Sequence, residues 1–84
     1  MGYKLTYTKT ALGDIKKLDS ITKKRLGKKL QEFCLNPLLY ATRLTNSQIG
    51  SYRWRVGNYR VVFDMYKKDI VILRIGHRKE IYKK

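Results

Sequence analysis

Arginine is the residue type in this 84-residue chain best suited to binding phosphate, and six of its seven arginines follow Pro37. The six are Arg43, Arg53, Arg55, Arg60, Arg74 and Arg78. Lysines dominate the segment before Pro37. A guanidinium can hold two phosphate oxygens at once through its planar fork, whereas a lysine ammonium acts as a point charge. The distribution predicts a phosphate-binding surface in the second part of the chain and a solvated, field-generating surface in the first.

The C-terminal segment 75–84 supplies the side chains that could move protons beside such a surface. His77 can exchange a proton near neutral pH, and Tyr82 can hydrogen-bond a reacting hydroxyl. Taken singly, His77, Arg78 and Tyr82 each have an ordinary structural explanation: a histidine at a strand end, a surface arginine and a tyrosine that closes the core. Beside a phosphate-binding surface they become candidate catalytic residues.

Metal and cofactor chemistry finds little support in the residues present. The six acidic residues are scattered singly, and no pair has the helix or strand spacing that would hold Mg²⁺. Cys34 and His77 are each the only residue of their type, which is too few for a zinc site or an intrachain disulfide. We therefore expect no metal, no cofactor and a reducing compartment.

Composition limits the class of protein further. The formal net charge is +14 with a pI near 10.2, yet 43% of the residues are hydrophobic, which is too apolar for a disordered basic tail. Residues 1–84 have room for a single domain. Charge of one sign destabilises a compact state, so the excess predicts a polyanionic partner. No stretch has the length of a signal peptide or a membrane span, and we expect a cytoplasmic location without membrane contact.

The elements that would position these side chains follow from hydrophobic periodicity. Alternation in 3–7 predicts a strand, and apolar residues at helical spacing predict helices over 10–18 and 20–35, the second ending at Asn36-Pro37. Segment 38–50 is mixed, with room for a short strand near Arg43. Strands are predicted at 52–56, 59–66 and 70–75. The expected fold is α+β: an N-terminal strand, an antiparallel helical hairpin, and a three- to four-stranded antiparallel sheet covered on one face by the helices.

The two-residue connection Gly57-Asn58 is of the type that β-hairpins favour, so it sets the pairing of two strands. The predicted pairs are Val56 with Tyr59, Arg55 with Arg60, Trp54 with Val61 and Arg53 with Val62. Alternation then puts apolar residues on one face and the three arginines on the other. Arg55 opposite Arg60 is a like-charge pair that costs stability. We expect this face to hold RNA phosphates, with Lys23, Lys24 and Lys28 on the polar side of the second helix as further RNA contacts.

The segments YRWRVGNYRVVF (52–63) and IGHRKEIY (75–82) resemble those of the RelE/ParE superfamily of type II toxins. The resemblance covers nearly the whole chain and implies the RelE-like microbial RNase fold. It also implies a toxin that enters the ribosomal A site and cleaves mRNA there without a metal, through attack by the 2′-hydroxyl. An acidic, RelB-like antitoxin would silence this toxin, and a dimer of heterodimers with that antitoxin is a further expectation.

The resemblance assigns roles by position. Arg53 and Arg55 match the two basic residues of the central strand, which would hold the RNA backbone. Arg60 and Arg78 would hold the scissile phosphate. Tyr82 matches the terminal tyrosine, which would contact the base and carry a proton, and His77 is the alternative proton carrier. Well-known RelE proteins have lysines in the central strand, and arginine is effectively never deprotonated, so neither Arg53 nor Arg55 suits a general base.

Two other functions compete with mRNA cleavage. A ParE-like toxin of the same fold would inhibit DNA gyrase without nuclease chemistry. A basic RNA- or ribosome-binding module would bind without cleaving. Arg60, Arg78 and Tyr82 occur together, and this favours the RelE-like function, because inhibition of a topoisomerase needs no phosphate site with a proton carrier.

Overall fold

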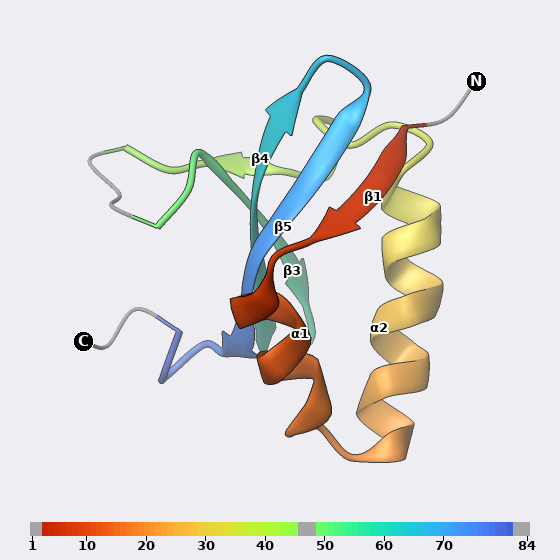
Figure 1. The fold of residues 1–84 in the computed structure, drawn as a ribbon, viewed down its shortest axis with the longest axis vertical. Coiled ribbons are helices and arrows are strands. Elements are labelled where there is room, and N and C mark those ends of the chain that lie inside the picture. Colours follow the sequence, from red (N-terminus) through yellow and green to blue (C-terminus); the bar gives the residue numbers. More distant parts are fainter. Residues whose placement is uncertain (1–2, 46–48, 82–84) are drawn as a thin grey trace.

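The computed structural model describes residues 3–45 and 49–81, and within them five strands and two helices follow one another. They are β1 (Lys4–Tyr7), α1 (Lys9–Lys16), α2 (Ser20–Phe33), β2 (Thr42–Arg43), β3 (Tyr52–Val56), β4 (Tyr59–Tyr66) and β5 (Asp69–His77). The strands form one sheet in the order β1-β5-β4-β3-β2, with α1 and α2 packed beside it (Figure 1). The expected α+β fold is confirmed.

Side-chain caps begin both helices. The Thr8 hydroxyl accepts the Ala11 N–H before α1, and the Asp19 carboxylate accepts the Thr22 N–H before α2. From α2, Leu26, Leu30 and Phe33 are buried in the core, so the apolar stripe of this helix faces the sheet.

The register of the central hairpin is the one that its turn predicts. Arg55 pairs with Arg60 and Trp54 with Val61. Trp54 and Phe63 are fully buried on the face that the helices cover, with ring centroids 4.1 Å apart. The Trp54 indole N–H donates to the Pro37 carbonyl at 2.9 Å, which ties the segment after α2 to the core.

Both short strands join the edges of the sheet. β1 pairs in parallel with β5, from Lys4 opposite Asp69 to Tyr7 opposite Ile72, so the sheet is mixed rather than antiparallel throughout. This position lets Leu5 pack against the core. β2 pairs with β3 at the other edge. Strands β2–β5 therefore form the predicted three- to four-stranded antiparallel sheet, and the predicted N-terminal strand, β1, joins it as a fifth, parallel strand.

The sheet face away from the helices is partly covered as well. A Cβ at Gly50 would lie 2.5 Å from Val62 Cγ1 and 2.9 Å from Leu73 Cδ1, so the backbone at Gly50 packs directly on both side chains. Ser51 donates its N–H to Asp64 Oδ1 at 2.7 Å. These contacts hold the chain before β3 against the sheet and explain why Val62 has no exposed surface.

Within the described residues, neither helix is long and apolar enough to cross a membrane.

Candidate functional site

Arg53, Arg55 and Arg60 lie on the sheet face opposite the helices, which we call the arginine face. Their cross-strand partners establish this, since Arg53 lies opposite Val62 and Arg55 lies opposite Arg60, while the intervening Trp54–Val61 pair is in the core. The structure thus brings together the three arginines that the hairpin pattern grouped.

The three side chains differ in exposure. Arg55 is exposed and Arg53 is half-buried, but Arg60 is only 8% exposed. Arg60 Nη1 donates to the carbonyls of Gly57 at 3.1 Å and Tyr59 at 3.0 Å. The turn therefore fixes Arg60 in place, whereas Arg55 meets solvent. Strand alternation alone does not distinguish the two.

The β3–β4 turn draws in a further arginine that the sequence did not single out. Gly57 has a φ of 58°, a conformation that favours glycine. A Cβ at this position would lie 3.2 Å from Arg25 Nη2, so the guanidinium of Arg25 reaches from α2 to the turn. The only signal in the sequence is that Arg25 is the single arginine before Pro37.

The C-terminal motif folds back at the same end of the sheet. Arg78 is exposed, and its backbone N–H donates to the Asn58 carbonyl at 2.7 Å, which places it beside the β3–β4 turn. Ile81 donates its N–H to the His77 carbonyl and is almost fully buried. A Cβ on Gly76, the cross-strand partner of Arg60, would lie 3.1 Å from Ile81 Cδ1. The turn after β5 therefore packs against Gly76, directly across the strands from Arg60.

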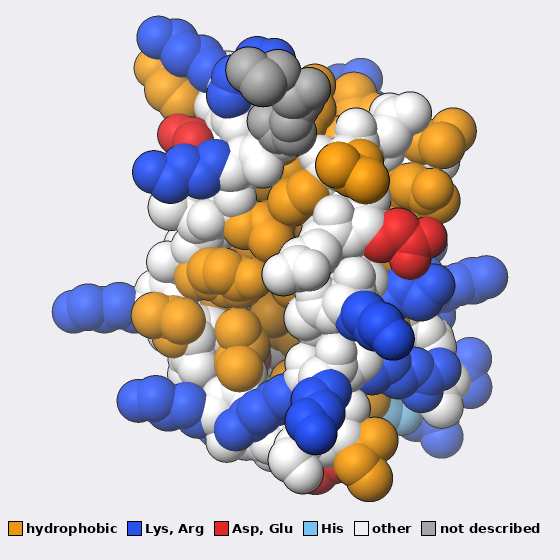
Figure 2. Space-filling view, turned by 90° about the vertical axis from the view of Figure 1, so that its right-hand side faces the viewer, with side chains coloured by type: hydrophobic (Ala, Val, Ile, Leu, Met, Phe, Trp, Pro, Cys, Tyr) orange, Lys and Arg blue, Asp and Glu red, His pale blue; other side chains and the backbone are white. Residues whose placement is uncertain are grey.

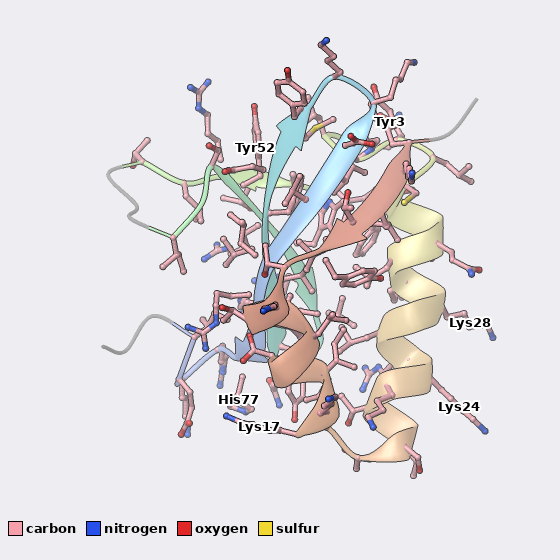
Figure 3. The ribbon with its side chains drawn as sticks, viewed as in Figure 1. Tyr3, Lys17, Lys24, Lys28, Tyr52 and His77 are labelled. Atoms are coloured by element: carbon pink, nitrogen blue, oxygen red, sulfur yellow. The ribbon has the colours of Figure 1, made fainter. Side chains whose placement is uncertain are left out.

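His77 lies on the other side of the sheet from Arg55 and Arg60. Its cross-strand partner is Tyr59, with ring centroids 5.6 Å apart, and it lines a pocket of about 250 Å³ together with Asp14 and Lys17 of the α1 region (Figure 3). His77 Nδ1 accepts the Lys79 N–H at 3.2 Å. The structure does not bring this candidate proton carrier to the arginine face, and Tyr82 lies outside the described residues.

Two acidic residues, Asp64 and Asp14, make structural contacts. The Asp64 carboxylate accepts from Ser51 N–H, as described above. Asp14 Oδ2 accepts from Arg74 Nε and from Ile75 N–H, both at 2.9 Å, at the part of β5 that β1 does not reach. Among residues 3–45 and 49–81, no group of three or more His, Cys, Asp and Glu side chains could hold a metal ion.

The lysines predicted to contact RNA are on the opposite side of the molecule. Lys23, Lys24 and Lys28 are exposed on α2, and Figure 3 shows Lys24 and Lys28 pointing away from the sheet. The core lies between them and the arginine face, so the lysines and the arginines do not form one continuous surface.

Beside α2 runs an apolar furrow, which we call the helix groove. It holds about 180 Å³ and is lined by Tyr7, Ile15, Leu18, Lys23, Leu26, Gly27, Leu30 and Ile75. Figure 2 shows hydrophobic side chains along the middle of this side of the molecule, with lysines and arginines to both sides. The groove could accept apolar side chains of a partner while the surrounding cations attract acidic ones.

The fold and the site define a small, strongly basic α+β domain with an arginine cluster beside the β3–β4 turn. The family model described as the ParE toxin of the type II toxin–antitoxin system parDE matches residues 5–82 of this chain. The chain belongs to this family, within the RelE/ParE superfamily, and is a toxin of a toxin–antitoxin system of this type.

Individual relatives agree with this assignment. Toxin RelE3 of Methanocaldococcus jannaschii is 33% identical in an alignment 84 positions long, which covers 94% of this chain and 94% of that one. One chain of the RelBE2 toxin–antitoxin complex from Mycobacterium tuberculosis superposes with a TM-score of 0.84 at 26% identity, covering 93% of this chain and 100% of that one. The isolated E. coli RelE toxin gives a TM-score of 0.74 at 26% identity, and the match covers 89% of this chain and 83% of that one.

Proposed function

We propose that this toxin is a metal-independent endoribonuclease that cleaves mRNA in the ribosomal A site. The observation that carries the proposal is the Arg55–Arg60 cross-strand pair, with Arg78 beside the same turn. Two like charges directly opposite each other destabilise a sheet. A phosphate bound there would offset that repulsion, and the RNA backbone supplies one.

In the proposed reaction the 2′-hydroxyl of the mRNA attacks the adjacent phosphorus. A bond forms between the 2′-oxygen and phosphorus, the bond from phosphorus to the 5′-oxygen breaks, and a cyclic phosphate remains. The 2′-oxygen loses a proton and the 5′-oxygen gains one. Arginines that surround the phosphate offset the charge that develops on its oxygens and hold the strand in position.

Burial divides the arginines by role. Arg55 and Arg78 are exposed, so we assign them to direct contact with phosphate oxygens, with Arg53 holding the backbone farther along β3. Arg60, fixed by the carbonyls of Gly57 and Tyr59, supplies positive charge beneath the phosphate and keeps the turn in shape. This assignment makes Arg55 and Arg78 the cleaner targets for mutation.

The test is primer extension on mRNA in a translating extract. Cuts within codons that need ribosomes are expected from the wild type and should fall at least about 100-fold for Arg55→Ala and Arg78→Ala, because each removes charge from the transition state. Lys24→Ala, across the core, is the matched control; it removes one positive charge away from the arginine face and should lower the cleavage rate far less than either arginine variant. Wild-type cleavage by both arginine variants would refute the assignment.

The proton carrier needs a separate comparison. We propose Tyr82, because His77 lies across the sheet from Arg55 and Arg60. Tyr82→Phe should lower the cleavage rate strongly, whereas His77→Gln should leave it within a few-fold of wild type. The reverse order would assign proton transfer to His77.

A ParE-like activity is the alternative, and the description of the matching family model favours it. Such a toxin would act on DNA gyrase. A supercoiling assay with purified gyrase separates the two functions: inhibition of supercoiling together with intact mRNA would establish the ParE-like activity. Ribosome binding with neither effect would indicate a non-catalytic module.

The partner that we propose is an acidic, RelB-like antitoxin. Solved relatives include RelB–RelE complexes from Pyrococcus horikoshii and Methanococcus jannaschii. A net charge of +14 favours an acidic partner, and the helix groove offers apolar contacts between cations. Folding of an antitoxin on this surface would neutralise the toxin in the cytoplasm, and two such heterodimers would associate through the antitoxin.

A further inference from the structure

Four large apolar side chains project from the segment that follows α2. Leu35 is 74% exposed, Leu38 52%, Leu39 68% and Tyr40 44%. We call these four residues the leucine patch. Scattered single apolar residues are normal on a protein surface, but a cluster of this kind marks an interaction site.

The backbone of this segment is held in place by the core. Its Pro37 carbonyl accepts the indole N–H of Trp54, a fully buried residue. The Tyr40 ring contacts buried Phe33, with centroids 4.9 Å apart. Leu39 donates its N–H to Asn36 at 3.1 Å. The leucines are therefore presented by a fixed loop, so a partner would lose little conformational entropy of the toxin on binding.

Positive charge borders the leucine patch at both ends. At one end, Tyr3 donates its N–H to the Cys34 carbonyl, and Lys68 Nζ lies 5.3 Å from the centroid of the Tyr3 ring. At the other end, β2 carries the exposed Arg43. The nearby acid Glu32 contacts Lys29 at 3.5 Å. An occupant with aliphatic residues flanked by acidic ones would match both features.

Other occupants match less well. Leucine side chains cannot hydrogen-bond phosphates or bases, so RNA gains nothing from them. A second copy of this chain would bring another charge of +14 against the first. An acidic protein segment meets neither objection.

We propose that the leucine patch binds an acidic, amphipathic segment of the antitoxin, and that this contact is separate from neutralisation of the arginine face. The inference rests on the proposed function for the identity of the partner. Figure 1 shows the end of α2 and the loop that follows it at the opposite end of the molecule from the β3–β4 turn. A segment bound there would tether the antitoxin and leave Arg55 and Arg78 uncovered.

The test uses the full toxin, its Arg78→Ala form for expression, in which cleavage is expected to be lost, and a purified acidic, RelB-like antitoxin. Leu35→Ser combined with Leu39→Ser should weaken antitoxin binding at least about 10-fold, as expected when apolar contacts at an interface are lost. Ile21→Ser is the matched control, since Ile21 is 76% exposed at the other end of α2, and it should change the affinity less than about 2-fold. Circular dichroism should give the same spectrum for all forms.

Ribosome-dependent cleavage by the patch variant, measured with Arg78 restored, should match the wild type. Unchanged antitoxin affinity would overturn the inference and leave the proposed function standing. A wild-type chain that neither cleaves mRNA nor binds the antitoxin would overturn both. Binding to phosphatidylglycerol vesicles that the patch variant loses, with antitoxin affinity intact, would assign the patch to a lipid surface instead.

Discussion

Arg55 and Arg60 form one cross-strand pair but have different surroundings. Two carbonyls of the turn accept hydrogen bonds from Arg60, which is nearly buried, whereas Arg55 is exposed. Hydrogen bonds from a charged donor are stronger than those from a neutral donor. The bonds from Arg60 to the turn carbonyls therefore offset part of the repulsion between Arg55 and Arg60. Loss of Arg60 would therefore disturb the turn as well as any phosphate, and its effect on cleavage alone cannot separate the two roles.

Asp14 is a residue on which the end of β5 depends. It accepts from Ile75 N–H and from Arg74, and its side chain is only 10% exposed. Asp14→Ala would leave an N–H of the sheet edge and a guanidinium without this acceptor, at a cost of about 2 kcal/mol. Thermal unfolding should show a melting temperature lower by roughly 10 °C. Asp14→Asn keeps one acceptor oxygen, so its melting temperature should fall less than that of Asp14→Ala. An unchanged melting temperature in Asp14→Ala would contradict this account.

Asp19 gives the stability of α2 a dependence on pH. Hydrogen bonds from the Thr22 side chain and backbone lower the pKa of Asp19 below its ordinary value. Because the pKa of Asp19 is lower in the folded protein than in the unfolded chain, its ionised carboxylate stabilises the folded state at pH values above the unfolded pKa of about 3.9. This stabilisation is lost as the pH falls through the pKa of the folded state. Asp19→Asn retains a helix cap that does not titrate. Urea unfolding from pH 6 to pH 2 should therefore show a stability difference between the two proteins that shrinks toward low pH.

At the scale of elements, local chemistry determined what could be predicted. A two-residue turn fixes the pairing of its strands, so the hairpin register followed directly from Gly57-Asn58. The partner of a four-residue strand such as β1 depends on where the helices place it, which local pattern does not encode. Its parallel pairing with β5 was therefore missed, along with the mixed character of the sheet.

The candidate site was predictable to the same extent. Alternation grouped Arg53 and Arg55 with Arg60, but the burial of Arg60 depends on turn carbonyls and on the packing of the segment after β5. Proximity in sequence suggested that His77 would join the arginines. The register of β4 and β5, interrupted by a bulge near Val62, puts it opposite Tyr59 on the other face instead.

Two glycines should respond in opposite directions to alanine. At Gly50 a new Cβ would meet Val62 and Leu73 at distances that force the backbone off the sheet, so Gly50→Ala should destabilise by about 1–3 kcal/mol. At Gly13, inside α1, nothing lies within 4 Å of a new Cβ. Gly13→Ala should stabilise by up to about 1 kcal/mol through helix propensity. Chemical denaturation checks both, and a stabilised Gly50→Ala protein would contradict the close packing.

At the scale of the whole molecule, the charge of +14 is distributed over two sides. Lys24 and Lys28 extend from α2, and Arg55 lies on the opposite side of the sheet. The shortest extent of the domain is 23 Å, compared with a Debye length of about 8 Å at physiological ionic strength. Each side therefore acts on its own surroundings.

Salt dependence of binding should separate these two sides. For a short single-stranded RNA, Arg55→Ala should reduce the slope of log K against log salt by about 0.7, the contribution of one phosphate contact. Lys24→Ala with Lys28→Ala should leave that slope unchanged, because the strand does not reach α2. With intact ribosomes, both sets of changes should flatten the slope, since RNA would then surround the protein. Equal flattening by both sets on the short RNA would show that one strand contacts α2 and the arginine face together.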